Sequence, residues 1–169
     1  MNFTGFINEY KKQIIGSIIT ASIIWAASYI YNHVLFPDRY ITGQWVTYMT
    51  TKKTNYKAYK DGVSVYVLNI IQMQDNTITG TGEKIKDSTA DGIVVKYETV
   101  QRDRIAFKGT IEQKKFGKAI VNISATTYGS RYTTTAHFKL NVIDENHIQG
   151  TFNTTIADGS GIVEMKKTE

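Results

Sequence analysis

The stretch that decides the fold is Ala136-His137-Phe138-Lys139-Leu140-Asn141-Val142, in which apolar residues occupy every even-numbered position. A period of two is typical of a β-strand that turns one face toward a core and the other toward water. The segment Val63-Ser64-Val65-Tyr66-Val67 alternates in the same way, with valine along one face. The sequence therefore predicts β-structure across most of the chain.

Similar segments follow one another from residue 44 onward, separated by turn-forming residues such as Asp61-Gly62 and Asp91-Gly92. The expected strands cover residues 44–50, 63–73, 77–85, 93–101, 104–113, 119–127, 131–143, 147–156 and 162–166. Short connections predict an antiparallel up-and-down meander, and a long meander closes into a barrel because closure removes the unpaired edges. We expect an all-β domain, a closed barrel of about eight strands.

A small repeat supports closure. An apolar residue, any residue and Gly-Thr recur around Gly80, Gly109 and Gly150. Glycine weakens a strand unless the chain bends or another backbone approaches closely, so these positions indicate barrel corners. The segment Gly43-Gln44-Trp45 at the first strand is similar to the Gly-x-Trp of lipocalin-like barrels, in which the tryptophan plugs the closed end.

The N-terminal part of the chain has a different character. Residues 14–36 contain no Asp, Glu, Lys or Arg. As a helix this segment would be about 35 Å long, enough to cross a hydrocarbon core of about 30 Å. Pro37 ends it at once. A cleaved signal peptide is the alternative, but apolar and aromatic residues continue beyond the small-residue stretch 26–28, which favours an uncleaved anchor.

These features divide the chain into four parts. We expect a polar tail (1–13), one N-terminal transmembrane α-helix (14–36), a linker (37–43) and a β-barrel ligand-binding domain (44–169). Counting Lys and Arg on both sides of the helix gives a slight preference for a cytoplasmic barrel, and hence for a single-pass protein of the inner membrane. The formal net charge of +5 permits an anionic partner without requiring one.

Residue types that carry catalysis are not grouped in this sequence. Cysteine is absent, the three histidines have no metal-ligand spacing, and most Asp residues stand at turns, where they bond the local backbone. Asp158-Gly159-Ser160-Gly161 is typical of a hairpin loop, in contrast to a nucleophile elbow. We therefore expect no enzyme, no catalytic or metal-binding residue, and no cofactor.

Binding is the function class that the aromatic and basic residues favour. Tyrosines lie near arginines at the expected strand ends, where rings can stack on bases and guanidinium groups can bind phosphates. Each of these residues alone is also compatible with a merely structural role, since tyrosine suits half-buried strands. The candidate ligand-binding residues are Tyr97, Arg102, Arg104, Tyr128, Arg131 and Tyr132.

Small residues recur four apart in the apolar helix. Gly16 with Thr20 and Ser17 with Ala21 would allow two such helices to approach closely, and they are the candidate helix-packing residues. Small residues are common in any transmembrane helix, so the same pattern also fits a helix that does not self-associate.

The order of these parts resembles the transmembrane β-barrel effectors of bacterial CBASS antiphage systems, the kind associated with a CD-NTase. The resemblance implies a barrel that binds a cyclic dinucleotide second messenger made by the CD-NTase. Binding would drive homo-oligomerisation, disruption of the inner membrane and cell death, with no role for DNA or RNA. It rests on architecture from residue 14 to 166, and one difference is that such effectors are expected to have two N-terminal spans.

Two other functions fit the same sequence. A membrane-tethered lipocalin-like barrel would bind a lipid or other apolar ligand in its interior. A structural envelope subunit would have a solid barrel without a pocket.

Overall fold

The computed structural model describes residues 3–31, 40–98, 102–114, 118–129 and 133–168. The chain divides into two compact units, residues 1–38 and 39–169. The first unit contains helix α1 (Phe3–Tyr29), and the second contains nine strands and two short 3₁₀ helices, η2 (Lys57–Tyr59) and η4 (Ile156–Asp158). The strands are β1 (Gly43–Lys53), β2 (Val63–Gln72), β3 (Thr77–Ser88), β4 (Val94–Lys96), β5 (Arg104–Glu112), β6 (Ile120–Tyr128), β7 (Thr133–Val142), β8 (His147–Thr154) and β9 (Ser160–Lys167).

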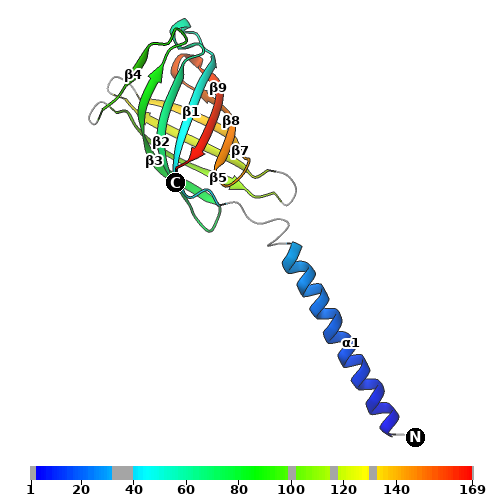
Figure 1. Ribbon diagram of the computed structural model, residues 1–169. Coiled ribbons are helices and arrows are strands. Elements are labelled where there is room, and N and C mark those ends of the chain that lie inside the picture. The colour runs from blue at the N-terminus through cyan, green and yellow to red at the C-terminus, as the bar shows by residue number, and fades with distance from the viewer. Residues whose placement is uncertain (1–2, 32–39, 99–101, 115–117, 130–132, 169) are drawn as a thin grey trace. The chain divides into compact units, whose positions relative to one another are not determined.

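The second unit is a closed antiparallel barrel of eight strands, as the sequence predicts. Strands β1, β2, β3, β5, β6, β7, β8 and β9 pair in chain order, and β9 returns to pair with β1. Figure 1 shows these strands wrapped around a common interior, with β1 and β9 side by side. Closure leaves no free edge among the eight strands of the ring.

Strand β4 is an addition to the ring and a correction to the predicted strand over residues 93–101. It spans three residues and pairs only with the end of β3, Lys86 opposite Lys96. This part of β3 is available because the pairing of β5 with β3 stops at Glu83. Residues 99–101 lie outside the described part of the chain.

One end of the barrel is filled by apolar side chains. Trp45 is 0% exposed, and its indole Nε1 donates a 2.8 Å hydrogen bond to the carbonyl oxygen of Ile41. Ile70, Ile148 and Met165 are almost as deeply buried, and they come from the ends of β2, β8 and β9 that lie beside the start of β1. The prediction that Trp45 plugs a closed end is confirmed.

The glycines of the Gly-Thr repeat are needed for close approach of neighbouring strands. A Cβ atom at Gly109 would collide with the carbonyl oxygen of Asn122 on β6, and one at Gly150 would collide with that of Lys139 on β7. Any larger residue would push these strands apart, which explains why the repeat occurs inside strands.

Helix α1 begins earlier than the predicted apolar helix and includes the polar residues 3–13. Its hydroxyl groups bond within the helix, since Ser17 Oγ donates to Gln13 O and Thr20 Oγ1 donates to Gly16 O, each at 2.9 Å. The last residues of the predicted span, 32–36, and most of the predicted linker lie outside the described part of the chain. In the described ranges, no helix has both the length and the apolar character needed to cross a membrane.

Candidate functional site

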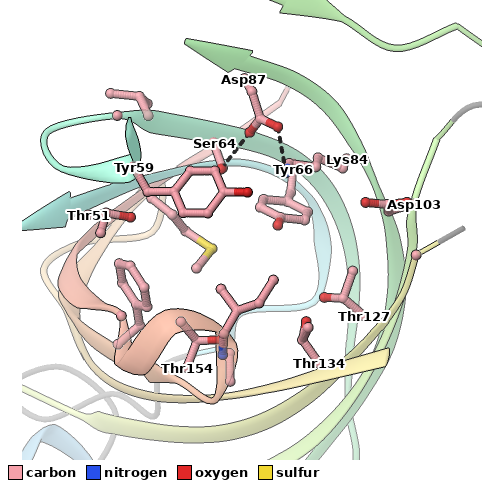
Figure 2. Close-up of a pocket in the computed structure, with 18 of the residues that line it drawn as sticks. Thr51, Tyr59, Ser64, Tyr66, Lys84, Asp87, Asp103, Thr127, Thr134 and Thr154 are labelled. Atoms are coloured by element: carbon pink, nitrogen blue, oxygen red, sulfur yellow. Dashed lines mark hydrogen bonds and ion pairs between the residues drawn. The ribbon is translucent and has the colours of Figure 1, made fainter. Parts of the chain in front are cut away.

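The end of the barrel opposite Trp45 encloses a cavity of about 570 Å³ (Figure 2). Its walls come from the end of β1, the start of β2, the end of β3 and the corresponding ends of β5 to β8, with η2 and η4 at the rim. A barrel with one filled end and one hollow end has the form of a cup. The volume is within the range of small-molecule sites in proteins.

The cavity has a polar wall near the open end of the barrel and an apolar floor toward Trp45. The serine and threonine residues of the wall are Thr51, Thr54, Ser64, Ser88, Thr89, Thr127, Thr134 and Thr154. The apolar residues of the floor include Met49, Ile105, Ala136, Phe138 and Phe152. The rings of Phe138 and Phe152 lie 6.3 Å apart between centroids, so the floor offers aromatic surface to a ligand. This distribution suits an amphipathic molecule.

A β-bulge in β3 places two opposite charges inside the cup. Tyr66 pairs with Lys84 but Val65 pairs with Lys86, so Ile85 is an extra residue in the ladder. Without it, residues 84 and 87 would point to opposite faces of the strand. With it, Lys84 and Asp87 both line the cavity.

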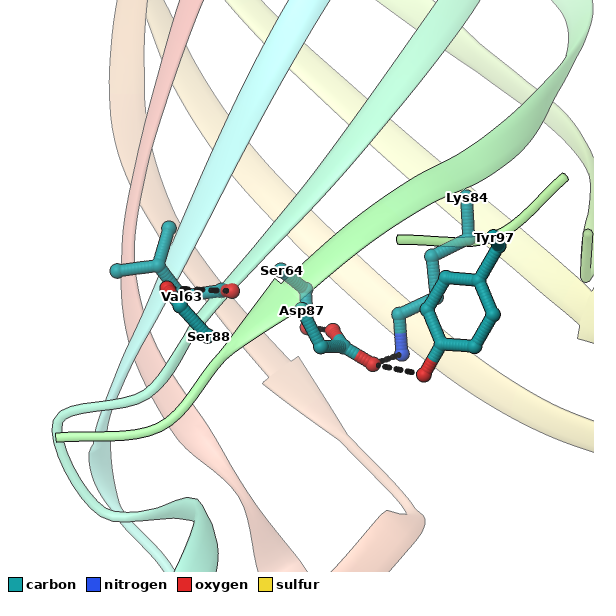
Figure 3. Close-up of polar contacts among 6 residues, drawn as sticks. All are labelled: Val63, Ser64, Lys84, Asp87, Ser88 and Tyr97. Carbon is teal, nitrogen blue, oxygen red and sulfur yellow. Dashed lines mark hydrogen bonds and ion pairs between the residues drawn. The ribbon is translucent and has the colours of Figure 1, made fainter. Parts of the chain in front are cut away.

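Asp87 is the centre of the polar contacts in the cavity (Figure 3). Its Oδ1 accepts a 2.6 Å hydrogen bond from Ser64 Oγ, and its Oδ2 accepts one of 2.7 Å from the hydroxyl of Tyr97. Lys84 Nζ lies 2.6 Å from the same Oδ2. Both carboxylate oxygens are therefore engaged by groups from β2, β3 and the residue after β4.

Aromatic rings hold the Lys84 ammonium group in place. Nζ lies 5.9 Å from the ring centroid of Tyr66 and 5.6 Å from that of Tyr97, within the range of cation–π attraction. Burial raises the pKa of Tyr66, and the charge of Asp87 adds to the rise. Burial also raises the pKa of Tyr97, helped by its hydrogen bond to Asp87. Both phenols stay neutral at physiological pH, and the cluster as a whole has no net charge.

Asp103 is a third charged group of the cavity wall. Its main-chain oxygen accepts a 2.9 Å hydrogen bond from the backbone N–H of Lys84, which places Lys84 of β3 opposite Asp103, the residue before β5. Among the described residues, no basic side chain lies within ion-pair distance of its carboxylate. With Lys84 and Asp87 compensating each other, the described lining carries one excess negative charge.

The structure brings one of the predicted binding residues, Tyr97, into the cavity. Arg102 lies nearby but binds elsewhere: its Nη1 pairs with Glu83 Oε2 at 3.0 Å, and its Nε donates a 3.2 Å hydrogen bond to the carbonyl oxygen of Tyr97. Arg131 and Tyr132 lie outside the described part of the chain.

The expected positions of Arg104 and Tyr128 need correction. Both side chains lie on the outer surface, and Tyr128 is 56% exposed. The reason is strand alternation, because Ile105 and Thr127 occupy the inward positions next to them and line the cavity. The predicted ligand-binding site is therefore not built from these two residues.

The sequence interpretation missed Lys84, Asp87 and Asp103. Alternation cannot assign Lys84 and Asp87 to one face, because they are an odd number of residues apart and the bulge at Ile85 leaves no clear signal in the sequence. Asp103 could have been found, since it is two residues before the inward-facing Ile105. No group of His, Asp or Glu able to hold a metal ion occurs within the described ranges.

The fold of this chain is similar to that of several solved structures. No protein-family model and no curated protein sequence matches this chain. Similar solved structures include a redesigned β-barrel, mFAP0, bound to DFHBI, with 14% identity, a TM-score of 0.49, and coverage of 76% of this chain and 98% of that one. Another is EF1p2_mFAP2b bound to DFHBI, with 11% identity and a TM-score of 0.49, covering 76% of this chain and 94% of that one.

Proposed function

We propose that this chain is a membrane-tethered, lipocalin-like binding protein whose barrel takes up a small amphipathic ligand through its open end. The observation that carries the proposal is the cavity of about 570 Å³ opposite the Trp45 plug. Its hydroxyl-rich wall and aromatic floor can satisfy the polar and apolar parts of one molecule at the same time. A structural subunit would gain nothing from leaving this volume unfilled.

A matched pair of substitutions tests this function. Thr134 lines the cavity, whereas the preceding Thr133 is exposed on the outer face of β7. We expect the full-length protein to bind the neutral fluorescent probe N-pentyl-dansylamide. Thr134→Trp should weaken binding about tenfold or more by filling the cavity, while Thr133→Trp should leave it unchanged. Absence of binding, or equal effects of the two substitutions, would refute a binding function for this cavity.

Tethering to a membrane is the second part of the proposal. Residues 14–36 have the composition of a span, and the hydroxyl groups of Ser17 and Thr20 are satisfied by the carbonyls of their own helix. The full-length protein should therefore remain in the membrane pellet after a sodium carbonate wash. Ile19→Lys combined with Ile23→Lys should release it to the supernatant. Release of the unaltered protein would argue against an integral anchor.

A second candidate function is the one implied by the family resemblance: an antiphage effector activated by a cyclic dinucleotide. Two features of the cavity favour it, the Tyr97 ring as a stacking surface and the Lys84 ammonium as a phosphate partner. The excess negative charge of the described lining counts against a ligand with two phosphates.

Calorimetric titration of the full-length protein with cyclic di-AMP and cyclic di-GMP separates the two candidates. Saturable binding that is weakened by Lys84→Gln would support the effector. Its ligand-driven assembly would then be tested with Ser17→Leu and Ala21→Leu, which fill the small-residue face that includes Gly16 and Thr20. No heat of binding with either nucleotide would count against the effector and favour the carrier.

A further inference from the structure

The charges of the cavity indicate which chemical class of ligand it accepts. The charged residues of its described lining are Lys84, Asp87 and Asp103. Lys84 is already engaged, with Nζ 2.6 Å from Asp87 Oδ2 and close to two tyrosine rings. Asp87 is engaged as well, through Ser64 and Tyr97. An incoming charged group would have to break this cluster to use either residue.

Asp103 is the charged residue of the described lining that takes no part in the Lys84–Asp87 cluster. It lies at the edge of the cavity, on the same side as Lys84 and Thr127 (Figure 2). Lys84 is its neighbour across the β3–β5 ladder, yet Nζ is directed to Asp87. The carboxylate has no hydrogen bond or ion pair to another side chain of the described residues, and Asp103 as a whole residue is of intermediate exposure. A carboxylate at the edge of a cavity without a side-chain partner can pair with a cation or a strong hydrogen-bond donor from a ligand.

The rest of the cavity is suited to the remainder of such a ligand. The floor below Asp103 contains Ile105, Phe138 and Phe152, which offer apolar contact. The threonines of the wall can donate or accept hydrogen bonds and do not compete for charge. From this arrangement we infer that the cavity selects an amphipathic amine, whose protonated nitrogen pairs with Asp103 while its apolar body occupies the floor. This inference rests on the proposed binding function and specifies its ligand class.

Two probes that differ in one amino group provide the test. Monodansylcadaverine carries a dansyl group and a five-carbon chain that ends in a primary amine, and N-pentyl-dansylamide is the same molecule without the amine. Fluorescence titration of the full-length protein at pH 7 should give about tenfold tighter binding of the amine. Asp103→Asn should remove this preference, so that the two probes bind the variant with equal affinity. Asp91→Asn, which removes the same charge from an exposed turn, should keep the preference.

The outcomes separate the inference from the function beneath it. Equal affinity for the two probes would overturn the amine inference and leave the binding function intact. Failure of both probes to bind would overturn both. A measurement without any variant guards against misfolding of Asp103→Asn: n-octylamine should displace N-pentyl-dansylamide at lower concentration than n-octanol or octanoate does. Displacement by octanoate at the same or lower concentration would overturn the inference.

Discussion

The hydroxyl of Tyr97 donates a 2.7 Å hydrogen bond to Oδ2 of Asp87, which ties the residue after β4 to the interior wall of the barrel. The backbone N–H of Tyr97 also donates to the carbonyl oxygen of Ile85, the extra residue of the bulge, at 3.1 Å. One irregularity in β3 therefore directs Asp87 into the cavity and anchors the segment that covers its edge.

The hydroxyl of Tyr97 should govern the local stability of β4. Strand β4 has three residues and few backbone hydrogen bonds of its own. Loss of the hydrogen bond from Tyr97 to the Asp87 carboxylate should therefore change the stability of this strand. We expect Tyr97→Phe to speed amide hydrogen exchange in residues 93–97 by about two- to tenfold, with the rest of the barrel unchanged. Tyr128→Phe, on the outer surface, serves as the control. Equal exchange in Tyr97→Phe and the unaltered protein would mean that the contact does not hold β4.

Neutralising Asp87 should destabilise the whole barrel. Asp87→Asn keeps the shape of the side chain but removes the charge that Lys84 depends on, and it weakens the bonds from Ser64 and Tyr97. The expected loss is about 1–2 kcal/mol in the free energy of unfolding, measured by urea denaturation. Asp91→Asn in the exposed turn is the matched control and should stay close to the unaltered protein.

Truncating the Trp45 plug should destabilise the barrel more than neutralising Asp87 does. Trp45→Ala removes a fully buried side chain and the partner of the Ile41 carbonyl, and the expected loss is about 3–5 kcal/mol in the free energy of unfolding. Trp25→Ala is the control in the same chain, since Trp25 is 70% exposed. Urea denaturation followed by circular dichroism avoids reliance on tryptophan fluorescence. Similar unfolding midpoints for the two variants would contradict the role of Trp45 as a plug.

A single methyl group at the Gly109 position should separate β5 from β6. Gly109→Ala places a Cβ against the carbonyl oxygen of Asn122, and overpacking of this kind costs about 1–3 kcal/mol. Gly16→Ala is the control because nothing lies within 4 Å of a Cβ there. Thermal unfolding should show a lower midpoint for Gly109→Ala and an unchanged one for Gly16→Ala.

The stability of the barrel should fall steeply in strongly alkaline solution because of Tyr66. Its pKa in the folded protein is raised above the value of about 10 for an unfolded tyrosine. Between those pH values only the unfolded chain releases the proton, so the free energy of unfolding decreases as pH rises above about 10, by at most about 1.4 kcal/mol per pH unit for this residue. Tyr66→Phe should show a shallower decline above pH 10 and a parallel curve below pH 9. Identical slopes above pH 10 would contradict the raised pKa.

The parts of the fold that depend on local pattern were predictable. In β7 the apolar positions from Ala136 to Val142 are the inward ones, and Trp45 closes the barrel as its Gly-x-Trp setting indicates. The strand count followed from turn residues and from the need to pair every edge. These features depend on an alternation of apolar and polar residues that is repeated along many strands, so one irregular position does not change the prediction.

The site was less predictable because it depends on exceptions. In β2 the alternating valines suggest the core face, yet Tyr66 and Leu68 belong to the core cluster and Val65 does not. The bulge then reverses the phase of β3, which alternation alone cannot reveal. Arg104 and Tyr128 were expected in the cavity, but the residues next to them, Ile105 and Thr127, face it, and these two side chains lie on the surface.

The Trp45 plug also has a kinetic consequence. A cup has one opening, so a ligand of the proposed kind would leave by the path through which it entered, past Tyr97 and the threonines of the cavity wall. The buried Trp45 side chain fills the other end, so the described cavity does not extend along the whole barrel axis. Residues at the rim are therefore expected to slow entry and exit together, which lengthens the residence time of a bound ligand.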